Sequence, residues 1–465
     1  MPCIIRIDIR EPFSYPHPMP NNLLSKIAVI ADDLTGANDA GVQFAKHGLD
    51  TIVLMGEHFP SEVIEEDVVV ADTRSRSLAP DEAYRKVAGT ANLIRDGRFH
   101  TVFKKIDSTL RGNIGREIDA IMDACGKELA VVAPAFPKNG RTTVGGYLLL
   151  RGAPLEATEI ARDLLCPITE SHIPTLLSGQ TVRKVGHVGI KSIVAGPEGI
   201  ADAMGRMFLA GGRVIVCDAW EDEHLEMVVS AALRLGRSVL WVGSAGLAEY
   251  LPSVLGQAAA PPGKKPAERN PAAGKPVVVL AGSVSHVTQR QVWMLKQRAA
   301  MGYIEADPCA LLKPGTANRE ISRCLNVALG AVKSGRDVVI TTGFNGDAVD
   351  KVRTEALSLN LSVRQAAGGI AAALGDLCRR IATGAALGGL VLTGGDIARS
   401  CCDLLSATGF KVVEEVAPGI PLGVLKGGPC DGLRVVTKAG AFGAEDALSR
   451  AVDCLRQEKR EGAGS

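Results

Sequence analysis

Residues 26–39 read KIAVIADDLTGAND, an apolar run that leads without a break into a polar, glycine-containing segment. The apolar run is typical of a strand that is buried on both faces, and the polar segment is typical of a strand-to-helix turn. The same order of apolar run, turn and helix-period segment recurs along the chain. This pattern predicts an α/β fold built on parallel sheets.

A proline-rich stretch separates two sets of apolar runs. The first set predicts strands at 26–31, 51–55, 67–72, 101–106, 129–133, 213–218 and 239–242, and the second at 277–281, 337–341, 389–393 and 433–437. The stretch between them, 256–276, has no periodicity and is typical of a linker. We therefore expect two α/β domains, at 26–255 and 277–450, with mainly parallel sheets and a ligand cleft between them.

The composition limits the class of partner. The 465 residues exceed the usual size of one hydrophobic core, which agrees with two domains. The 52 basic and 51 acidic residues leave a formal net charge of +1, so the chain as a whole does not attract nucleic acid or an anionic membrane. We expect a small-molecule ligand, with no nucleic acid and no membrane partner.

The termini, cysteines and histidines favour a cytoplasmic protein without a metal site. We expect loose tails at 1–25 and 451–465, and Met19 is a candidate alternative start, so the native status of the first 18 residues is open.

The 11 cysteines contain no CxxC pair, and no apolar stretch is long enough to span a membrane. The 8 histidines lack HxH or HxxxH spacing, so we expect no zinc.

Carboxylates and cations gather at successive strand ends of the first domain. Asp32 and Asp33 follow the first strand, and helix capping explains one of them but not both. Later strand ends add ADTRSRS at 71–77 and KKIDSTLRGNIGRE at 104–117. A hydroxylated anion needs this combination, because arginine and lysine bind its carboxylate and aspartate binds its hydroxyls. The loop at 133–149 either covers this ligand or is structural.

Glycine turns at three strand ends of the second domain favour phosphate binding. They are VVVLAGSVSHVTQRQV at 277–292, GLVLTGGDIARSCCDLL at 389–405 and RVVTKAGAFGAEDAL at 434–448. At such turns the backbone approaches a ligand, and the free amides of the next helix point at negative charge. Ser283 and Ser285 add hydroxyl donors, and Asp396 either caps its helix or holds Mg²⁺. Neither a P-loop nor a GxGxxG fingerprint is present.

Six motifs occur in a fixed order: ADDLTGAND, ADTRSRS, KKIDSTLRGNIG, APAFPKNGRTTVGG, VLTGGD and KAGAFG. Together they resemble the four-carbon acid sugar kinase family, which includes D-threonate, D-erythronate and 3-oxo-tetronate kinases. The resemblance covers about 26–450. It implies an N-terminal acid-sugar-binding domain, a C-terminal ATP-binding domain, and ATP-dependent phosphorylation of the terminal hydroxyl of the substrate.

The resemblance also assigns roles to residues. It implies nucleotide contacts at Ser285, Gly394, Gly395, Asp396, Ile397 and Gly440, and substrate contacts at Asp33, Arg74, Lys105 and Arg111. We add Ser283 to the nucleotide contacts, because its hydroxyl lies in the same glycine turn as Ser285, and Asp32 to the substrate contacts, because it is adjacent to Asp33. The family typically has a hydroxyl residue where this chain has Ile397, so we expect a backbone contact there.

Our mechanistic hypothesis is that Asp33, or Asp107 in its place, orients the substrate hydroxyl and accepts its proton, while Mg²⁺ bridges the ATP phosphates. Domain closure would align the reacting oxygens and exclude water. We expect D-threonate as substrate, with D-erythronate and 3-oxo-tetronate as alternatives. Rival functions are a ligase, an oxidoreductase, and a non-catalytic sensor of sugar acid and nucleotide. The sequence leaves substrate stereochemistry and oligomeric state open, a homodimer included.

Overall fold

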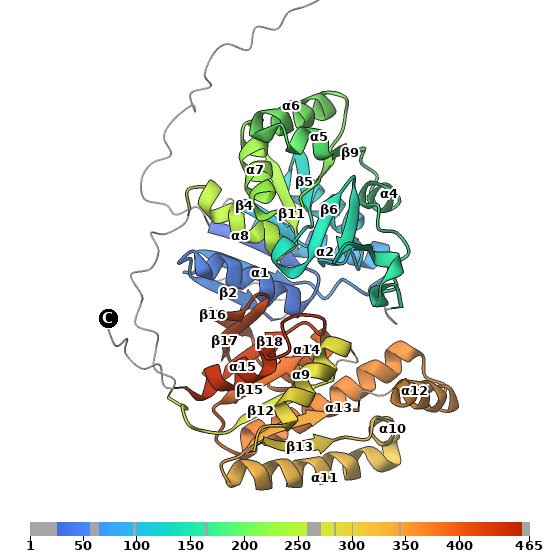
Figure 1. Cartoon of the computed structure of the whole chain (residues 1–465), viewed down its shortest axis with the longest axis vertical. Coiled ribbons are helices and arrows are strands. Elements are labelled where there is room, and N and C mark those ends of the chain that lie inside the picture. Colours follow the sequence, from blue (N-terminus) through green and yellow to red (C-terminus); the bar gives the residue numbers. More distant parts are fainter. Residues whose placement is uncertain are drawn as a thin grey trace, which may run out of the picture.

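The computed structural model describes residues 26–55, 65–95, 99–162, 166–257, 271–282, 285–299, 301–343 and 346–457. The expected N-terminal tail and most of the expected linker lie outside these ranges. The chain forms two halves, each a sheet covered by helices (Figure 1). This confirms the predicted fold class of two α/β domains with mainly parallel sheets.

The first half is a parallel sheet that contains every strand predicted for it. In spatial order its strands are β2 (Thr51–Leu54), β3 (Val68–Asp72), β1 (Lys26–Ala31), β4 (Phe99–Lys105), β11 (Val239–Gly243), β5 (Leu129–Ala133), β10 (Val214–Cys217) and β9 (Val185–Val188). Its helices are α1 (Leu34–Lys46), α2 (Pro80–Ile94), α3 (Ile114–Cys125), α4 (Ile173–Ser178), α5 (Ile190–Ile193), α6 (Gly196–Leu209), α7 (Asp222–Leu233) and α8 (Ala245–Val254). The strands are rich in valine because both faces of the sheet are buried.

The second half combines parallel strands with an antiparallel hairpin. In spatial order its strands are β13 (Met301–Glu305), β14 (Asp337–Thr341), β12 (Val277–Ala281), β15 (Gly389–Thr393), β18 (Arg434–Lys438), β17 (Ile420–Lys426) and β16 (Gly409–Ala417). Its helices are α9 (His286–Lys296), α10 (Pro308–Leu312), α11 (Pro314–Lys333), α12 (Gly346–Ser358), α13 (Val363–Gly384), α14 (Gly395–Leu404) and α15 (Ala447–Arg456). The sequence did not predict the hairpin β16–β17, because charged residues, proline and glycine interrupt its apolar pattern.

The loop predicted at 133–149 contributes to a small antiparallel sheet of its own. This sheet consists of β6 (Arg141–Val144), β7 (Tyr147–Leu150) and β8 (Ala153–Pro154). Its first turn is held by the buried carboxylate of Asp218, which accepts hydrogen bonds from the amides of Gly145 and Gly146, both at 2.8 Å. The β6–β7 hairpin is therefore anchored to the end of β10.

The two halves share one continuous sheet of 15 strands. Strand β16 of the second half pairs antiparallel with β2 of the first, with Phe410 opposite Val53. The Phe410 ring is fully buried and lies where a Cβ atom on Gly423 would overlap it, so glycine is required on the neighbouring strand β17. The ladder that joins the domains was not expected from two separate runs of βα units.

Helix α1 packs on both halves beside this joint (Figure 1). Its residues from Leu34 to Phe44 are all buried. Asn38 donates a hydrogen bond of 3.0 Å to the Thr437 hydroxyl of β18, and a Cβ atom at Gly41 would lie 3.4 Å from Val53 and 3.3 Å from Val412. The helix that follows the ADD motif therefore also positions the second domain.

Ion pairs also connect the two halves. Arg399 of α14 donates to Asp72 at the end of β3 with 2.7 Å between Nη1 and Oδ2. Asp403 of the same helix accepts from Arg74 at 3.0 Å. The Asp72 carboxylate is buried and its pair with Arg399 is shielded from salt, so this contact fixes α14 against the first domain.

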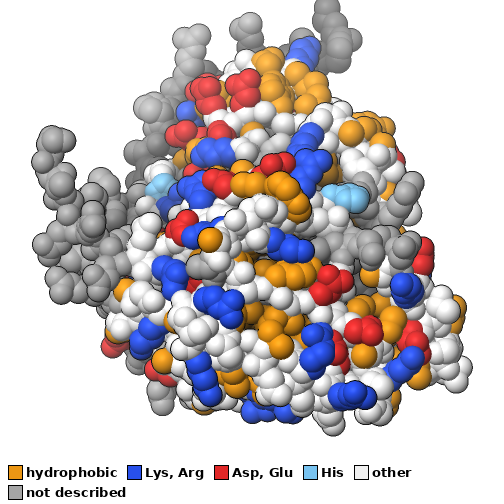
Figure 2. Space-filling model, turned by 60° about the horizontal axis from the view of Figure 1, so that its bottom comes forward, with side chains coloured by type: hydrophobic (Ala, Val, Ile, Leu, Met, Phe, Trp, Pro, Cys, Tyr) orange, Lys and Arg blue, Asp and Glu red, His pale blue; other side chains and the backbone are white. Residues whose placement is uncertain are grey.

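The structure also bears on the expected C-terminal tail, on membrane spans and on the surface charge. Helix α15 runs to Arg456, so the start of the expected C-terminal tail is helical, because Ala451, Val452 and Leu455 are buried in the core. Within the described ranges no helix is long and apolar enough to cross a membrane. Basic, acidic and apolar side chains are interspersed on the face shown in Figure 2, in line with the net charge of +1.

Phe410→Ala should destabilise the protein by about 3–5 kcal/mol, because it leaves a cavity at the ladder between the domains. The free energy of unfolding in urea measures this loss. Leu357→Ala, at a side chain that is 76% exposed, is the control and should change stability by less than about 0.5 kcal/mol. Equal effects of the two substitutions would show that the joint does not contribute to stability as described.

Candidate active site

A single arginine binds both carboxylates at the end of β1. Arg76 donates to Asp32 from Nε at 2.8 Å and from Nη2 at 3.0 Å, and to Asp33 from Nη1 at 2.9 Å and from Nη2 at 2.6 Å. Burial alone would raise the pKa of Asp32, but Arg76 and the nearby Lys104 lower it. The two aspartates predicted to be functional are thus brought together. Arg76, which lies in the quoted ADTRSRS motif, was not among the predicted site residues.

Asp33 also caps helix α1, as the capping interpretation expected of one of the two aspartates. Its Oδ1 accepts from the Gly36 amide at 2.9 Å, and its Oδ2 accepts from the Thr35 hydroxyl at 2.6 Å. With the two bonds from Arg76, both carboxylate oxygens are fully engaged. A substrate hydroxyl that binds Asp33 must therefore displace one of these donors.

Asp107 and Arg111 form a second carboxylate–guanidinium pair close by. Arg111 Nε donates to Asp107 Oδ2 at 2.7 Å, Thr109 donates to the same oxygen, and Arg76 lies 3.9 Å from Oδ1. Burial opposes ionisation of Asp107, but the two arginines outweigh it and hold the pKa of this carboxyl well below its usual range. Asp107 is therefore suited to accept hydrogen bonds and poorly suited to accept a proton.

Lys105 and Asp39 lie between this cluster and the second domain. Lys105 Nζ donates to the Ile106 carbonyl at 3.0 Å and lies 4.0 Å from Asp39 Oδ2. Asp39 Oδ1 is buried without a hydrogen-bond partner among the described residues, and burial raises the pKa of this carboxyl to about 7. The sequence indicated Asp39 only as part of the ADDLTGAND motif, because nothing in the pattern shows which face of the helix is buried.

The glycine turn of α14 meets Asp33 directly. A Cβ atom at Gly395 would lie 3.4 Å from Asp33 Oδ2 and 3.5 Å from the Thr35 hydroxyl. Gly394 has φ 102°, which strongly favours glycine. Asp396 lies in the first turn of the helix. The expected phosphate turn and the expected substrate carboxylates are thus in contact across the domain boundary.

The other two glycine turns flank this one. Ser285 caps α9 by accepting from the Val287 amide at 3.3 Å, and Ser283 lies outside the described residues. Two hydrogen bonds fix the backbone at Gly440, because its carbonyl accepts from the Thr288 hydroxyl at 2.8 Å and from the Lys438 ammonium at 3.0 Å. Lys438 therefore holds the backbone of this turn in place.

Two expected contacts lie elsewhere than the family pattern suggests. Arg74 adopts φ 51° and points to Asp403 at the surface, whereas Arg76 occupies the centre of the site. Ile397 is 6% exposed and lies where a Cβ atom on Gly282 would be 2.7 Å from its Cγ1. Its side chain fills the space between two glycine turns, which explains an apolar residue at this position.

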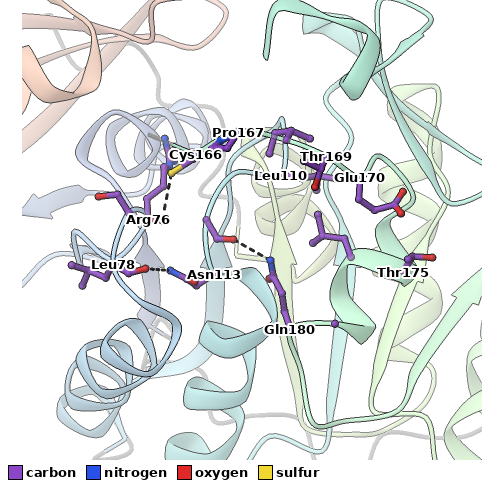
Figure 3. Close-up of a pocket in the computed structure, with 15 residues that line it drawn as sticks. Arg76, Leu78, Leu110, Asn113, Cys166, Pro167, Thr169, Glu170, Thr175 and Gln180 are labelled. Carbon is purple, nitrogen blue, oxygen red and sulfur yellow. Dashed lines mark hydrogen bonds between the residues drawn. The ribbon is translucent and has the colours of Figure 1, made fainter. Parts of the chain in front are cut away.

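A pocket of about 520 Å³ opens beside the carboxylate cluster (Figure 3). Asn113 shapes one wall by donating to the Leu78 carbonyl at 2.9 Å, and Gln180 donates to the Gly112 carbonyl at 3.3 Å. Among its described lining residues Arg76 alone is cationic, and Arg76 already binds two carboxylates. The pocket is large enough for a small metabolite but offers no uncompensated charge to hold an anion.

Comparison with known proteins agrees with this two-part site. Residues 27–251 match the family described as a sugar-binding N-terminal domain, and residues 278–448 match a nucleotide-binding C-terminal domain. A D-threonate kinase from Salmonella typhimurium is 35% identical over 92% of this chain and 97% of its own. A D-erythronate kinase from Heliobacterium modesticaldum is 34% identical over 93% and 97%, and a 3-oxo-tetronate kinase from Brucella melitensis is 30% identical over 93% and 96%.

This chain belongs to the four-carbon acid sugar kinase family. It is therefore a phosphotransferase with an alcohol group as acceptor, and its second domain binds a nucleotide. A crystal structure of a Salmonella typhimurium LT2 protein described as a tRNA synthase has the same fold, with a TM-score of 0.75, 26% identity and coverage of 92% of this chain and 98% of its own. A Haemophilus influenzae protein of 24% identity, with a TM-score of 0.67 and coverage of 92% and 100%, shares the fold.

Asp39 should make this kinase less stable as the pH rises. Its pKa is about 7 when folded and near 3.8 when unfolded, so the folded state binds more protons between these values. Stability therefore falls as the pH rises through this window and stays low above it. Asp39→Asn removes this effect, so its Tm should exceed that of the wild type by a few degrees at pH 8 and by less at pH 5.

The control for this measurement is Asp202→Asn, whose side chain is 72% exposed and paired with Arg206. Its Tm should follow that of the wild type at both pH values. A Tm difference for Asp39→Asn that is the same at pH 5 and pH 8 would contradict the raised pKa of Asp39.

Proposed function

We propose that this protein is an ATP-dependent kinase that phosphorylates the terminal 4-hydroxyl of D-threonate, with D-erythronate and 3-oxo-tetronate as alternative substrates. One observation carries the proposal: Asp33 of the acid-sugar domain lies against Gly395 at the phosphate turn of the nucleotide domain. A hydroxyl bound at Asp33 and a γ-phosphate bound at this turn would be neighbours, as in-line transfer requires.

The roles of the first domain follow from its hydrogen bonds. Asp33 orients the acceptor hydroxyl and takes its proton. To do so, the acceptor hydroxyl replaces the Thr35 hydroxyl as a hydrogen-bond donor to Asp33, and the Thr35 hydroxyl also lies near Gly395. Asp107 is the weaker candidate for this step, because its pKa is held well below its usual range. We assign it, with Asp32, to the other hydroxyls of the substrate, while Lys105 and Arg111 attract the substrate carboxylate. Arg74, at the surface with Asp403, contributes through the domain contact.

The roles of the second domain follow from its three turns. The backbone amides that follow Gly394 and Gly395 would bind the phosphates, and Ile397 would contribute only its backbone amide. Ser285 and Gly440 would border the nucleotide. Mg²⁺ usually binds through one or two carboxylates plus substrate phosphates, and Asp396 in the first turn of α14 fits this pattern. When bound, the ion would neutralise charge on the ATP phosphates.

The proposal includes a cytoplasmic location, where ATP is available. The buried thiols of Cys217, Cys324 and Cys378 agree with a reducing compartment. A homodimer is one of the assembly states that fit this function, and light scattering of the purified protein measures it directly.

ADP release should depend on the acid sugar supplied. We expect the highest kcat/KM with D-threonate, lower values with D-erythronate and 3-oxo-tetronate, and a phosphate on carbon 4 of the product by ³¹P NMR. A coupled assay across the three compounds measures this order. A non-catalytic sensor would release no ADP with any of them, and that result would refute the proposed function.

Asp33→Asn should lower kcat by roughly 10²–10⁴-fold, because the variant loses the proton acceptor, while the affinity for ATP stays close to that of the wild type. Steady-state kinetics and calorimetry with ATP separate the two effects. Asp81→Asn is the matched control, because its side chain is 81% exposed on the same domain. Near-normal turnover of Asp33→Asn would exclude Asp33 as the acceptor.

A further inference from the structure

Arg141 is a buried cation without a carboxylate partner at the junction of the domains. It opens strand β6 of the acid-sugar domain, and its side chain is 3% exposed. Its Nη1 donates to the Asn139 carbonyl, whereas its Nε has no hydrogen-bond partner among the described residues. Among the described residues, the carboxylates of Asp107 and Asp39 act on its charge without a hydrogen bond to it. A guanidinium in this state is unusual, since buried charges are normally paired.

The charges that surround Arg141 do not compensate it. Burial lowers the pKa of Arg141 to about 10, and of the nearby groups Asp107 and Asp39 favour its charge while Arg151 and Arg111 oppose it. Asp107 is already bound to Arg111. The electrostatic surroundings of Arg141 therefore favour an additional negative charge, in contrast to those of Arg76, which already binds two carboxylates.

The guanidinium is held in position by the nucleotide domain. Its Cζ lies 4.9 Å from the centroid of the Phe442 ring, which belongs to the KAGAFG turn. The Phe442 carbonyl accepts from Gln291 at 3.0 Å and from Lys438 at 3.2 Å, and the ring packs where a Cβ atom on Gly419 would lie 2.5 Å away. This cation–π contact with a well-packed ring holds the guanidinium next to the nucleotide domain.

We infer that Arg141 binds an anionic oxygen of the reactants at the domain junction, and that Phe442 of the nucleotide domain positions it for this task. The anion is either the carboxylate of the acid sugar or the phosphoryl group that is transferred; both offer the oxygens that a guanidinium fork binds. This inference rests on the proposed kinase function. It also gives the loop at 133–149 a role in ligand binding rather than a structural role alone.

The contact with Phe442 links Arg141 to the nucleotide domain. Phe442 lies two residues after Gly440, which we propose to border the nucleotide, so the ring that supports Arg141 belongs to the turn that would contact the nucleotide. Phe442 is in this sense a positioning residue and Arg141 a binding residue.

Kinetics of Arg141→Met with two acceptors test the inference. D-threonate and its neutral amide, D-threonamide, differ only in the charge of the group at carbon 1. If Arg141 binds the carboxylate, the variant should lose roughly 10–100-fold in kcat/KM with the acid and little with the amide. If Arg141 binds the phosphoryl group, both acceptors should lose the same factor in kcat, with ADP affinity unchanged.

Controls separate these results from a folding defect and from failure of the kinase proposal. Arg151→Met, at an exposed arginine close to the same hairpin, should retain wild-type kinetics. Phe442→Leu, which keeps an apolar side chain, should reproduce part of the Arg141→Met defect in a protein that is still folded by circular dichroism. Arg141→Lys, which keeps the charge but not the fork, replaces the Met variant if that one does not fold.

The inference is overturned if the Arg141 variant that folds keeps kcat/KM within about threefold of wild type with both acceptors. Failure of the kinase proposal looks different, because the wild type itself would then release no ADP. In that event calorimetric binding of D-threonate and of ATP to wild type and Arg141→Met still tests the anion site. Equal affinities of the two proteins for both ligands would overturn it.

Discussion

Arg76 holds the site together, because its guanidinium binds the adjacent carboxylates Asp32 and Asp33 at the same time. Two aspartates at one strand end repel each other, and burial increases the repulsion. The guanidinium of Arg76 offsets this repulsion, because its planar set of N–H donors binds both carboxylates at once. The single ammonium group of a lysine could not do this. The position of Asp33, its capping of α1 and its place beside the glycine turn of α14 all depend on this interaction.

The second constraint is the shared sheet. The ladder between β2 and β16, the packing of α1 on both halves and the pair between Asp72 and Arg399 fix the two domains on either side of Asp33. Any closing motion must therefore bend or twist one sheet rather than swing two bodies on a free linker. Such a motion keeps the carboxylates and the glycine turn close throughout, which suits transfer between two bound reactants.

The sequence predicted those features that are local. All the apolar runs became strands, and the carboxylates and glycine turns lie at their ends, because parallel strands bring their carboxyl ends to one edge. It could not choose between Arg74 and Arg76, since the outward turn of Arg74 depends on a positive φ angle that no pattern shows. The hairpin β16–β17 was also missed, and the sequence showed neither the burial of Asp39 nor the contact of Arg141 with Phe442. They depend on contacts across the domains, which are hundreds of residues apart in the chain.

The ladder between β2 and β16 also bears on how this architecture can change over time. Each half on its own would expose a strand with unpaired amides and carbonyls, β2 in one and β16 in the other, and such edges recruit other chains into aggregates. The halves are therefore not interchangeable modules, although each matches a family model of its own. Recombination that exchanged one half would also have to supply a matching edge, so we expect the two halves to be inherited as a unit.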